Sequence, residues 1–293
     1  NPNVIGQKIH HASEGLKGYR PVGQGRRVKE TAKAEGACAR VEASAKPMMP
    51  ATPSLAVHHQ CFRDQVATDF AISRFRKHHP DLPYHLWSDA GADFTEIAKK
   101  HNAHYSYSSK NVGHSLYDAE QLDELLKRIQ STAIQTGADL VLWMEDDVLT
   151  RGRIQVPADT QAGCLAATGN KLWPECIALI KDKYNVSPNQ SWFGMAGGAL
   201  INGELFRNHW NIIEEFSQVD YPALIKSCGP QIGYGDVILQ MIHLIADITC
   251  LQGGYVIDTN ERIAQNTPLL RRLKKWRLFS SPLVHGYKKH YKQ

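Results

Sequence analysis

The chain has 293 residues, of which 42% are hydrophobic and 22% are charged, and its formal net charge is +5. This is the composition of an ordinary globular protein, with enough apolar material for one large or two smaller domains. The positive excess lies in residues 1–52, which carry nine Lys or Arg and four Asp or Glu, so the remainder is balanced. A nucleic-acid-binding protein is expected to carry a basic stripe on its folded part, and the charge distribution therefore argues against that class.

Neither a membrane span nor a secretion signal is evident in the sequence. No apolar run reaches the roughly 18 residues that a spanning helix needs, and the first residues lack the charged-then-apolar pattern of a signal peptide. Either no targeting segment exists or it has been removed, so a cytoplasmic and a lumenal location both stay open. The six cysteines have no CxxC or zinc-like spacing. This favours isolated thiols, although their even number also permits disulfides in an oxidising compartment.

Residues 1–52 differ from the rest of the chain. They are rich in Ala, Gly, Lys and Glu, with scattered prolines and little periodicity. This pattern is typical of an extension, a linker or a stem. The alternative is an ordered arm that wraps around the body, with a short helix near Lys29–Ala39. We expect the main domain at residues 53–293.

From Ser54 onward, strand patterns alternate with helix patterns. The predicted helices repeat apolar residues at helical spacing, and the predicted strands are short apolar or aromatic runs that end at turn residues. The strands are expected at Leu55–Cys61, Tyr84–Trp87, His104–Tyr107 and from Leu140, and the helices at Asp64–His78, Thr95–His101 and about Ser115–Thr136. Because strand–helix–strand crossovers are right-handed, this order predicts an α/β fold with a mostly parallel sheet flanked by helices.

The second half of the chain is less regular. We expect a glycine-rich, strand-like run within Trp192–Asn202, a helix at Glu204–Phe216, a loop at Pro222–Gly235, a helix at Asp236–Ala246 and a short strand at Tyr255–Ile257. The last 25 or so residues, from Leu269, are basic and aromatic.

Three consecutive acids, Glu145, Asp146 and Asp147, follow the apolar run Leu140–Met144. A buried strand tolerates such a cluster only where it emerges at the edge of its sheet. In open α/β sheets the carboxyl edge is where ligands bind, and clustered oxygen ligands suit a hard divalent cation such as Mg²⁺ or Mn²⁺. A solvated acidic turn is the structural alternative.

The order of these features resembles that of the GT-A glycosyltransferases, a nucleotide-sugar-dependent family with a DxD-type metal motif, here Glu-Asp-Asp. The matching features are the first strand Leu55–Cys61, the second strand ending at Asp89, Asn111-x-Gly113, the long helix, Gly137-Ala138-Asp139, Glu145-Asp146-Asp147, Gly197–Phe206, Gly235–Leu239 and Val284–Lys288. The resemblance covers most of the chain from Ser54 onward. It implies a GT-A catalytic domain at 53–293, with a nucleotide-binding half at about 53–150 and a less regular acceptor-binding half at about 151–293.

The resemblance also implies a role for individual side chains. Asp147 and His285 would bind the metal, and Glu145 and Asp146 would orient the ribose or hold metal-bound waters. Asp89 would accept the imino proton of uracil, Asn111 would lie at the nucleotide, and Lys288 would bind the diphosphate. Asp236 would be the general base. Each position has a structural alternative. An Asp at a helix start or in a turn is often a cap, and a His beside lysines is often part of a solvated tail. Many inverting members have Glu-Asp where this chain has Gly235-Asp236, which leaves the acceptor contacts open.

A metal-dependent glycosyltransferase is the function that the resemblance implies. It would use Mn²⁺ or Mg²⁺ to transfer a sugar from a nucleoside diphosphate sugar, with a UDP-sugar favoured, to a hydroxyl group of a glycan or glycoconjugate, with inversion. The alternatives are a retaining glycosyltransferase, a nucleotidyltransferase, and a catalytically silent nucleotide-sugar-binding or scaffold protein. A nucleotidyltransferase usually has a glycine-rich basic loop after its first strand, where this chain has residues 58–63, His-His-Gln-Cys-Phe-Arg. No nucleic-acid partner is expected. The segment Leu269–Phe279 fits either a cover over bound nucleotide or a peripheral membrane contact.

Overall fold

The computed structural model describes residues 52–112, 116, 118–164, 174–187, 194–195, 197–229, 235–252, 256–258 and 281–285. The chain separates into two compact units, Asn1–Met48 and Met49–Gln293, and the described residues all belong to the second. The predicted N-terminal extension therefore lies outside the described residues apart from Thr52. So do Gly113, Lys288 and the basic segment Leu269–Phe279.

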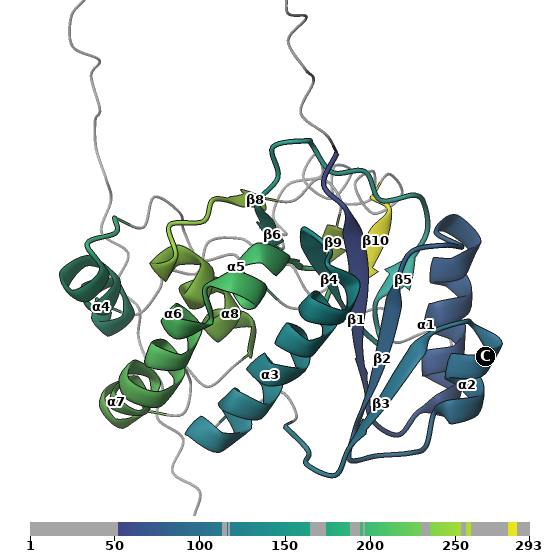
Figure 1. Ribbon diagram of the computed structural model, residues 1–293, viewed down its shortest axis with the longest axis horizontal. Helices are drawn as coiled ribbons and strands as arrows, with labels where there is room; N and C mark the ends of the chain where they lie inside the picture. The colour runs from purple at the N-terminus through teal and green to yellow at the C-terminus, as the bar shows by residue number, and fades with distance from the viewer. Residues whose placement is uncertain are drawn as a thin grey trace, which may run out of the picture. The chain divides into compact units, whose positions relative to one another are not determined.

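A seven-stranded sheet forms the centre of the described part (Figure 1). Its strands are β1 (Leu55–Cys61), β2 (Tyr84–Asp89), β3 (His104–Ser108), β4 (Leu140–Glu145), β6 (Ala162–Cys164), β7 (Leu200–Asn202) and β8 (Cys250–Gln252). They are ordered β3-β2-β1-β4-β7-β6-β8, and only β7 runs antiparallel to its neighbours. The predicted α/β class with a mostly parallel sheet is confirmed.

The register of the three central strands brings their carboxyl ends to one edge. In β1, Leu55 lies opposite Leu140 of β4, and Gln60 lies opposite Glu145. On its other side β1 pairs in parallel with β2. The acidic end of β4 is therefore level with the ends of its neighbours, as the apolar character of the strand and its acidic end predict.

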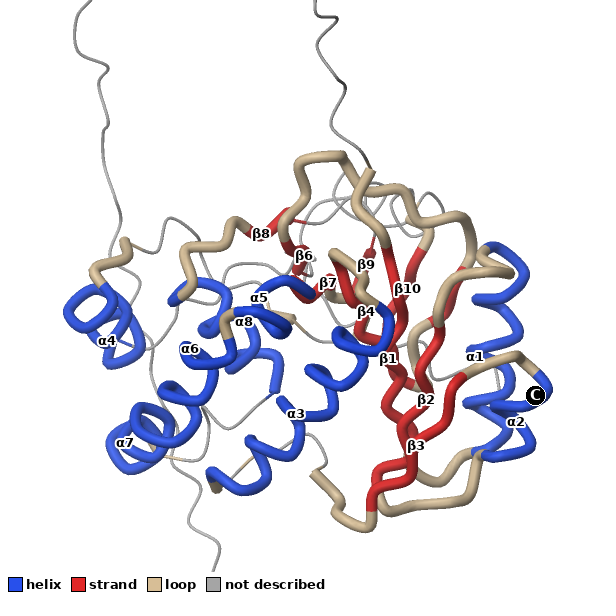
Figure 2. Tube along the Cα trace, viewed as in Figure 1, coloured by secondary structure: helices blue, strands red, loops and turns tan. Residues whose placement is uncertain are grey.

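Helices cover both faces of this sheet (Figure 2). They are α1 (Gln65–His78) and α2 (Thr95–Lys100) on one face and α3 (Ala119–Thr136) on the other. The Phe75 ring of α1 packs 5.3 Å from the Tyr84 ring of β2, whereas His58 of β1 contacts Thr132 of α3 at 2.9 Å. Alternate residues of the parallel strands thus face the two helical layers.

The ends of the helices follow capping rules. The side chain of Asp64 accepts a hydrogen bond from the Ala67 amide at the start of α1, and the side chain of Asp118 accepts one from the Gln121 amide at the start of α3. Helix α3 ends at Thr136 and is capped by Gly137, whose φ of +64° favours glycine. Because Asp118 is the N-cap, α3 begins at Ala119 and not near Ser115, where we had expected it to begin.

The described helices of the second half are α4 (Pro174–Tyr184), α5 (Gly203–Asn208), α6 (Trp210–Glu215), a π-helical turn η1 (Phe216–Asp220), α7 (Tyr221–Cys228) and α8 (Gly235–Ile245). Two expectations were wrong here. The helix predicted at Glu204–Phe216 is interrupted at His209, and much of the predicted loop from Pro222 is helix α7. Proline is tolerated in a first helical turn because the amides there have no intrahelical partner.

In the described part of the glycine-rich run, Gly197 and Gly198 form a turn. Of the predicted strand within Trp192–Asn202, only Leu200–Asn202 forms β7 in the described residues. Gly194 and Gly198 have φ values of +71° and +95°, which interrupt extended structure and favour glycine.

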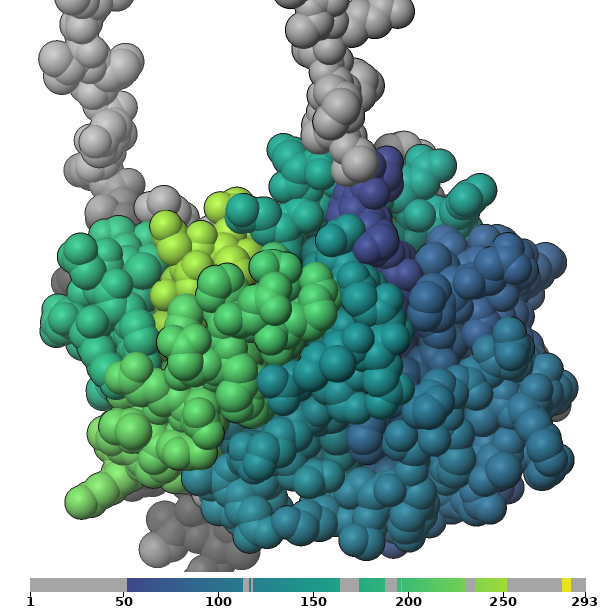
Figure 3. Space-filling model, in the orientation of Figure 1, coloured from purple at the N-terminus to yellow at the C-terminus, as the bar shows by residue number. Residues whose placement is uncertain are grey.

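A continuous apolar core joins the two halves. It connects α3 with α5 through α8 and includes Leu126, Ile129, Phe206, Phe216 and Ile242, which are all essentially buried. In Figure 3 the green surface of the second-half helices lies directly against the teal surface of α3.

Among the residues whose side chains are described, Cys61 and Cys176 are buried free thiols, which agrees with the expectation of isolated thiols at these two positions. None of the described helices combines the length and the apolar character required to cross a lipid bilayer.

A smaller three-stranded sheet adjoins the acidic turn. Its strands are β5 (Leu149–Thr150), β9 (Val256–Asp258) and β10 (Leu283–His285), in the order β5-β10-β9. β10 is antiparallel to β5 and parallel to β9. Since β5 begins two residues after Asp147, this sheet brings the C-terminal part of the chain to the acids.

Candidate metal centre

The turn between β4 and β5 carries the three consecutive acids. The backbone amide of Val148 donates a hydrogen bond to the carbonyl of Glu145 at 3.0 Å and closes the turn. The preceding residues Leu140–Met144 are buried, so the strand emerges from the core only where the acids begin. The turn therefore lies at the carboxyl edge of the parallel strands, where ligands of open α/β sheets bind.

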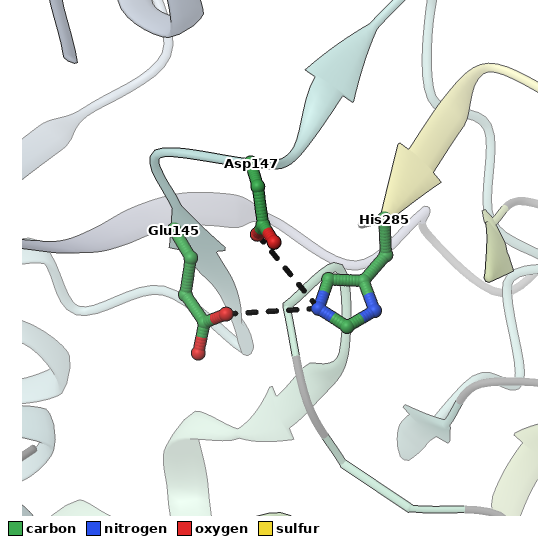
Figure 4. Close-up of side chains that lie close together, drawn as sticks. All are labelled: Glu145, Asp147 and His285. Carbon is green, nitrogen blue, oxygen red and sulfur yellow. Dashed lines mark ion pairs between the residues drawn. The ribbon is translucent and has the colours of Figure 1, made fainter. Parts of the chain in front are cut away.

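His285 reaches this turn from the far end of the chain. Val284 pairs with Leu149, and this pairing sets the imidazole against the acids (Figure 4). The Nε2 atom of His285 lies 3.6 Å from Oε2 of Glu145 and 3.8 Å from Oδ1 of Asp147. One ligand atom from each of the three residues lies within 4.8 Å of the others.

The chemistry of this donor set fits a divalent cation. Two carboxylates supply hard oxygen ligands and the imidazole supplies one nitrogen, and all three side chains are only partly buried. Oxygen ligands alone suit Mg²⁺, whereas an imidazole is a better ligand for transition metals. The mixed set therefore favours Mn²⁺ over Mg²⁺.

Neighbouring groups fix two members of the cluster in place. The indole Nε1 of Trp143 donates to Oε1 of Glu145 at 2.9 Å. Gly197 lies so close that a Cβ there would be 2.8 Å from the His285 ring and 3.2 Å from the Glu145 carboxylate. Only glycine fits at this position without displacing the candidate ligands.

Asp146 points away from the cluster. Its Oδ1 atom accepts a hydrogen bond from the Thr68 hydroxyl at 2.6 Å and lies 3.1 Å from Nε2 of His59. Of the three acids, the structure thus groups Glu145 and Asp147 with His285, and Asp146 with α1 and β1.

Asp89, at the end of β2, is almost completely buried. Its Oδ1 atom accepts hydrogen bonds from the guanidinium of Arg128 and from the backbone amide of Val112, both at 2.8 Å. The side-chain amide of Asn111 donates to the backbone carbonyl of Asp89 at 3.0 Å. In the structure these residues tie the loop after β3 to β2 and α3.

Asp236 lies in the first turn of α8. Its backbone carbonyl accepts a hydrogen bond from the Met195 amide at 3.1 Å, and its carboxylate accepts one from the Val237 amide at 3.0 Å. Burial raises the pKa of Asp236, and the charge of Glu145 raises it further, whereas His285 lowers it. The carboxylate of Asp236 is therefore close enough to Glu145 and His285 for their charges to influence its pKa.

Sequence reasoning missed several contacts of this site. It assigned Glu145 to the ribose or to metal-bound waters, placed Gly197 in the run Gly197–Phe206 without a role at the metal, and gave no role to Thr68. The position of Glu145 as the last residue of an apolar strand is a signal that points to the cluster. For Gly197 and Thr68 no comparable signal exists, because their neighbours at the site are distant in the sequence.

Neither a family model nor a curated protein matches the chain. Among solved structures, the chain is similar to a crystal structure of the galactosyltransferase LgtC in complex with donor and acceptor sugar analogues. The sequence identity is 15%, the match covers 78% of this chain and 86% of that chain, and the TM-score is 0.45.

Proposed function

We propose that the protein is a metal-dependent glycosyltransferase that uses a nucleoside diphosphate sugar, with a uridine nucleotide favoured. The observation that carries this proposal is the convergence of Glu145, Asp147 and His285 at the carboxyl edge of the parallel strands. Two acids from one strand end and an imidazole from the small sheet form a donor set for one divalent cation. When bound, such a cation neutralises charge on a departing diphosphate.

Asp236 is the proposed general base. It would take the proton from an acceptor hydroxyl of a glycan or glycoconjugate while the hydroxyl oxygen forms a bond to the anomeric carbon and the bond to the nucleoside diphosphate breaks. Its partial burial and its place near the cluster support this role. A single displacement of this kind inverts the anomeric configuration.

The donor proposal rests on the cation site and not on Asp89. Asp89 already accepts hydrogen bonds from Arg128 and Val112, so a bound uracil would have to share or replace these donors. Comparing the binding of uridine, guanosine, adenosine and cytidine diphosphates tests the preference for uridine.

A nucleotidyltransferase is less well supported. That class usually binds phosphate on a glycine-rich basic loop after the first strand, whereas here His58 and His59 are buried within β1. Asp64, which follows β1 closely, uses its carboxylate to cap α1.

A panel of nucleoside diphosphate sugars tests the proposal. With Mn²⁺, the parent protein is expected to release nucleotide from at least one donor, and chelation of the metal is expected to stop the release. Asp236→Asn is expected to bind the donor like the parent and to turn it over at least about 100-fold more slowly. If no donor is bound or cleaved, the proposed function fails. Binding without turnover would indicate the silent alternative, and a product with retained configuration would remove Asp236 from its role.

A further inference from the structure

The middle acid of the turn is held by a chain of buried hydrogen bonds that lies outside the metal cluster. Thr68 and His59 each bond to Asp146, and Tyr84 bonds to His59. All three side chains are almost fully buried. Thr68 belongs to α1, His59 to β1 and Tyr84 to β2. Three separate elements therefore converge on Asp146.

The direction of each hydrogen bond follows from the chemistry of Asp146. An ionised carboxylate only accepts, so Nε2 of His59 must carry the proton that it shares with Oδ1 of Asp146 at 3.1 Å. In the neutral imidazole, Nδ1 is then an acceptor and receives the Tyr84 hydroxyl proton at 2.7 Å. Burial raises the pKa of Tyr84 well above its usual value, which keeps this hydroxyl protonated.

Thr68 supplies the shortest contact. Its hydroxyl lies 2.6 Å from Oδ1 of Asp146 and 3.0 Å from the backbone carbonyl of Asp64. A hydroxyl has one proton, and the shorter distance to a charged acceptor directs it to Asp146. Both donors to Asp146 thus meet the same carboxylate oxygen, on the side of the turn that faces α1.

We propose that Asp146 is the anchor of the acidic turn, and that Thr68 and His59 are positioning residues that hold Glu145 and Asp147 toward His285. The Asp146 side chain is bonded toward α1 and β1, whereas Glu145 and Asp147 on either side of it lie beside His285. This inference rests on the proposed metal-dependent function, and it differs from a role of Asp146 at the ribose or at metal-bound water. Groups that orient metal ligands typically contribute about 10-fold to 100-fold to metal affinity.

Two substitutions of Asp146 separate the roles. Asp146→Asn keeps an oxygen that accepts from Thr68 and His59, whereas Asp146→Ala removes it. If Asp146 anchors the turn, the Mn²⁺ dissociation constant of Asp146→Asn is expected to stay within roughly threefold of the parental value. The dissociation constants of Asp146→Ala and of Thr68→Val are each expected to rise about 10-fold. Thr132→Val is the matched control, because Thr132 is likewise a buried threonine with a hydrogen-bonded hydroxyl, but its partner is His58 on the other face of the sheet.

A second measurement reports on the turn without metal. The imidazole resonance of His285, assigned by its loss in His285→Gln, is expected to shift in metal-free Thr68→Val and Asp146→Ala and to stay unchanged in Thr132→Val. If the parent binds no Mn²⁺, the proposed function fails, but this resonance still decides whether the anchor exists.

Two results would overturn the inference. One is an Asp146→Asn protein whose Mn²⁺ binding is weakened as much as that of Asp147→Asn, because the charge of Asp146 would then face the ligand. The other is a Thr68→Val protein that keeps both the parental Mn²⁺ affinity and the parental His285 resonance.

Discussion

At the scale of single residues, the acids of the sheet edge divide into those that face the candidate metal and those that stabilise the fold. Glu145 and Asp147 face His285, whereas the carboxylates of Asp89 and Asp146 accept hydrogen bonds from buried protein groups. This division depends on the path of each turn in three dimensions. The sequence predicts that acids gather at this edge but not which way each side chain points.

Asp89→Asn is expected to destabilise the protein by about 3 kcal/mol, because it leaves the guanidinium of Arg128 buried without its closest buried carboxylate. Urea unfolding followed by circular dichroism measures this change. Glu120→Gln is the control, since the pair of Glu120 with Lys110 is exposed and should contribute little. An Asp89→Asn protein with the parental unfolding midpoint would show that the buried pair does not stabilise the fold.

At the scale of elements, the first half of the fold is more predictable than the second, where α8 and β9 lie within one residue of the expected bounds but other elements do not. The strands and helices from Leu55 to Glu145 have regular periodicity and clear turn signals, and the structure places them where expected within a few residues. In contrast, β5, β6 and β8 have two or three residues, too few for a periodic pattern. The helix α7 begins beside Pro222, a residue that usually indicates a loop.

The ion-pair cluster around Asp220 connects α4 to the helices that follow β7. Asp220 lies in η1, is almost fully buried, and accepts hydrogen bonds from Lys183 at 2.8 Å and from the Tyr184 hydroxyl. Lys183 also pairs with Glu215 at 2.8 Å. Hydrogen bonds to Asp220 and Glu215 raise the pKa of Lys183, so this amine stays charged.

Asp220→Ala is therefore expected to loosen α4 selectively. Hydrogen exchange of the amides in Pro174–Tyr184 should become about 10-fold to 100-fold faster, as expected for the loss of hydrogen bonds between charged groups. The amides of α3 should keep their protection. The control Asp123→Ala removes a partly exposed ion pair, that of Asp123 with Lys127. Unchanged exchange in α4 would mean that apolar packing alone holds this helix.

At the scale of the whole molecule, buried neutral histidines make stability depend on pH. Burial lowers the pKa of His79 and of His243 to about 4 and that of His85 to about 3. His243 is fully buried, and its Nε2 atom accepts a hydrogen bond from the Asn202 amide at 3.0 Å, which requires the neutral ring.

The sign of the pH effect follows from the lowered pKa of these histidines. Below pH 6.5 these histidines bind protons in the unfolded chain but stay neutral in the folded chain. Their contribution to stability is therefore complete above pH 6.5 and decreases as the pH falls toward 4. For His243 the difference in pKa corresponds to about 3 kcal/mol at the acidic limit.

Between pH 6.5 and 4, His243→Gln is expected to take up about one proton fewer on unfolding than the parent. The slope of its unfolding free energy against pH is therefore expected to be smaller. The glutamine oxygen can still accept from the Asn202 amide and does not titrate in this range. Unfolding in urea at a series of pH values provides the measurement, with the exposed His209→Gln as control. An unchanged slope would show that His243 is not held in its neutral form.

Calorimetric titration of Mn²⁺ shows directly whether Glu145 and Asp147 form one cation site with His285, which is far from them in the sequence. The metal-free parent is expected to bind one Mn²⁺ per chain, and His285→Gln, which removes the imidazole contributed by β10, is expected to bind at least about 10-fold more weakly. His209→Gln should bind like the parent. A parent protein that binds no Mn²⁺, or a His285→Gln protein that binds it with parental affinity, would show that these residues do not form a metal centre.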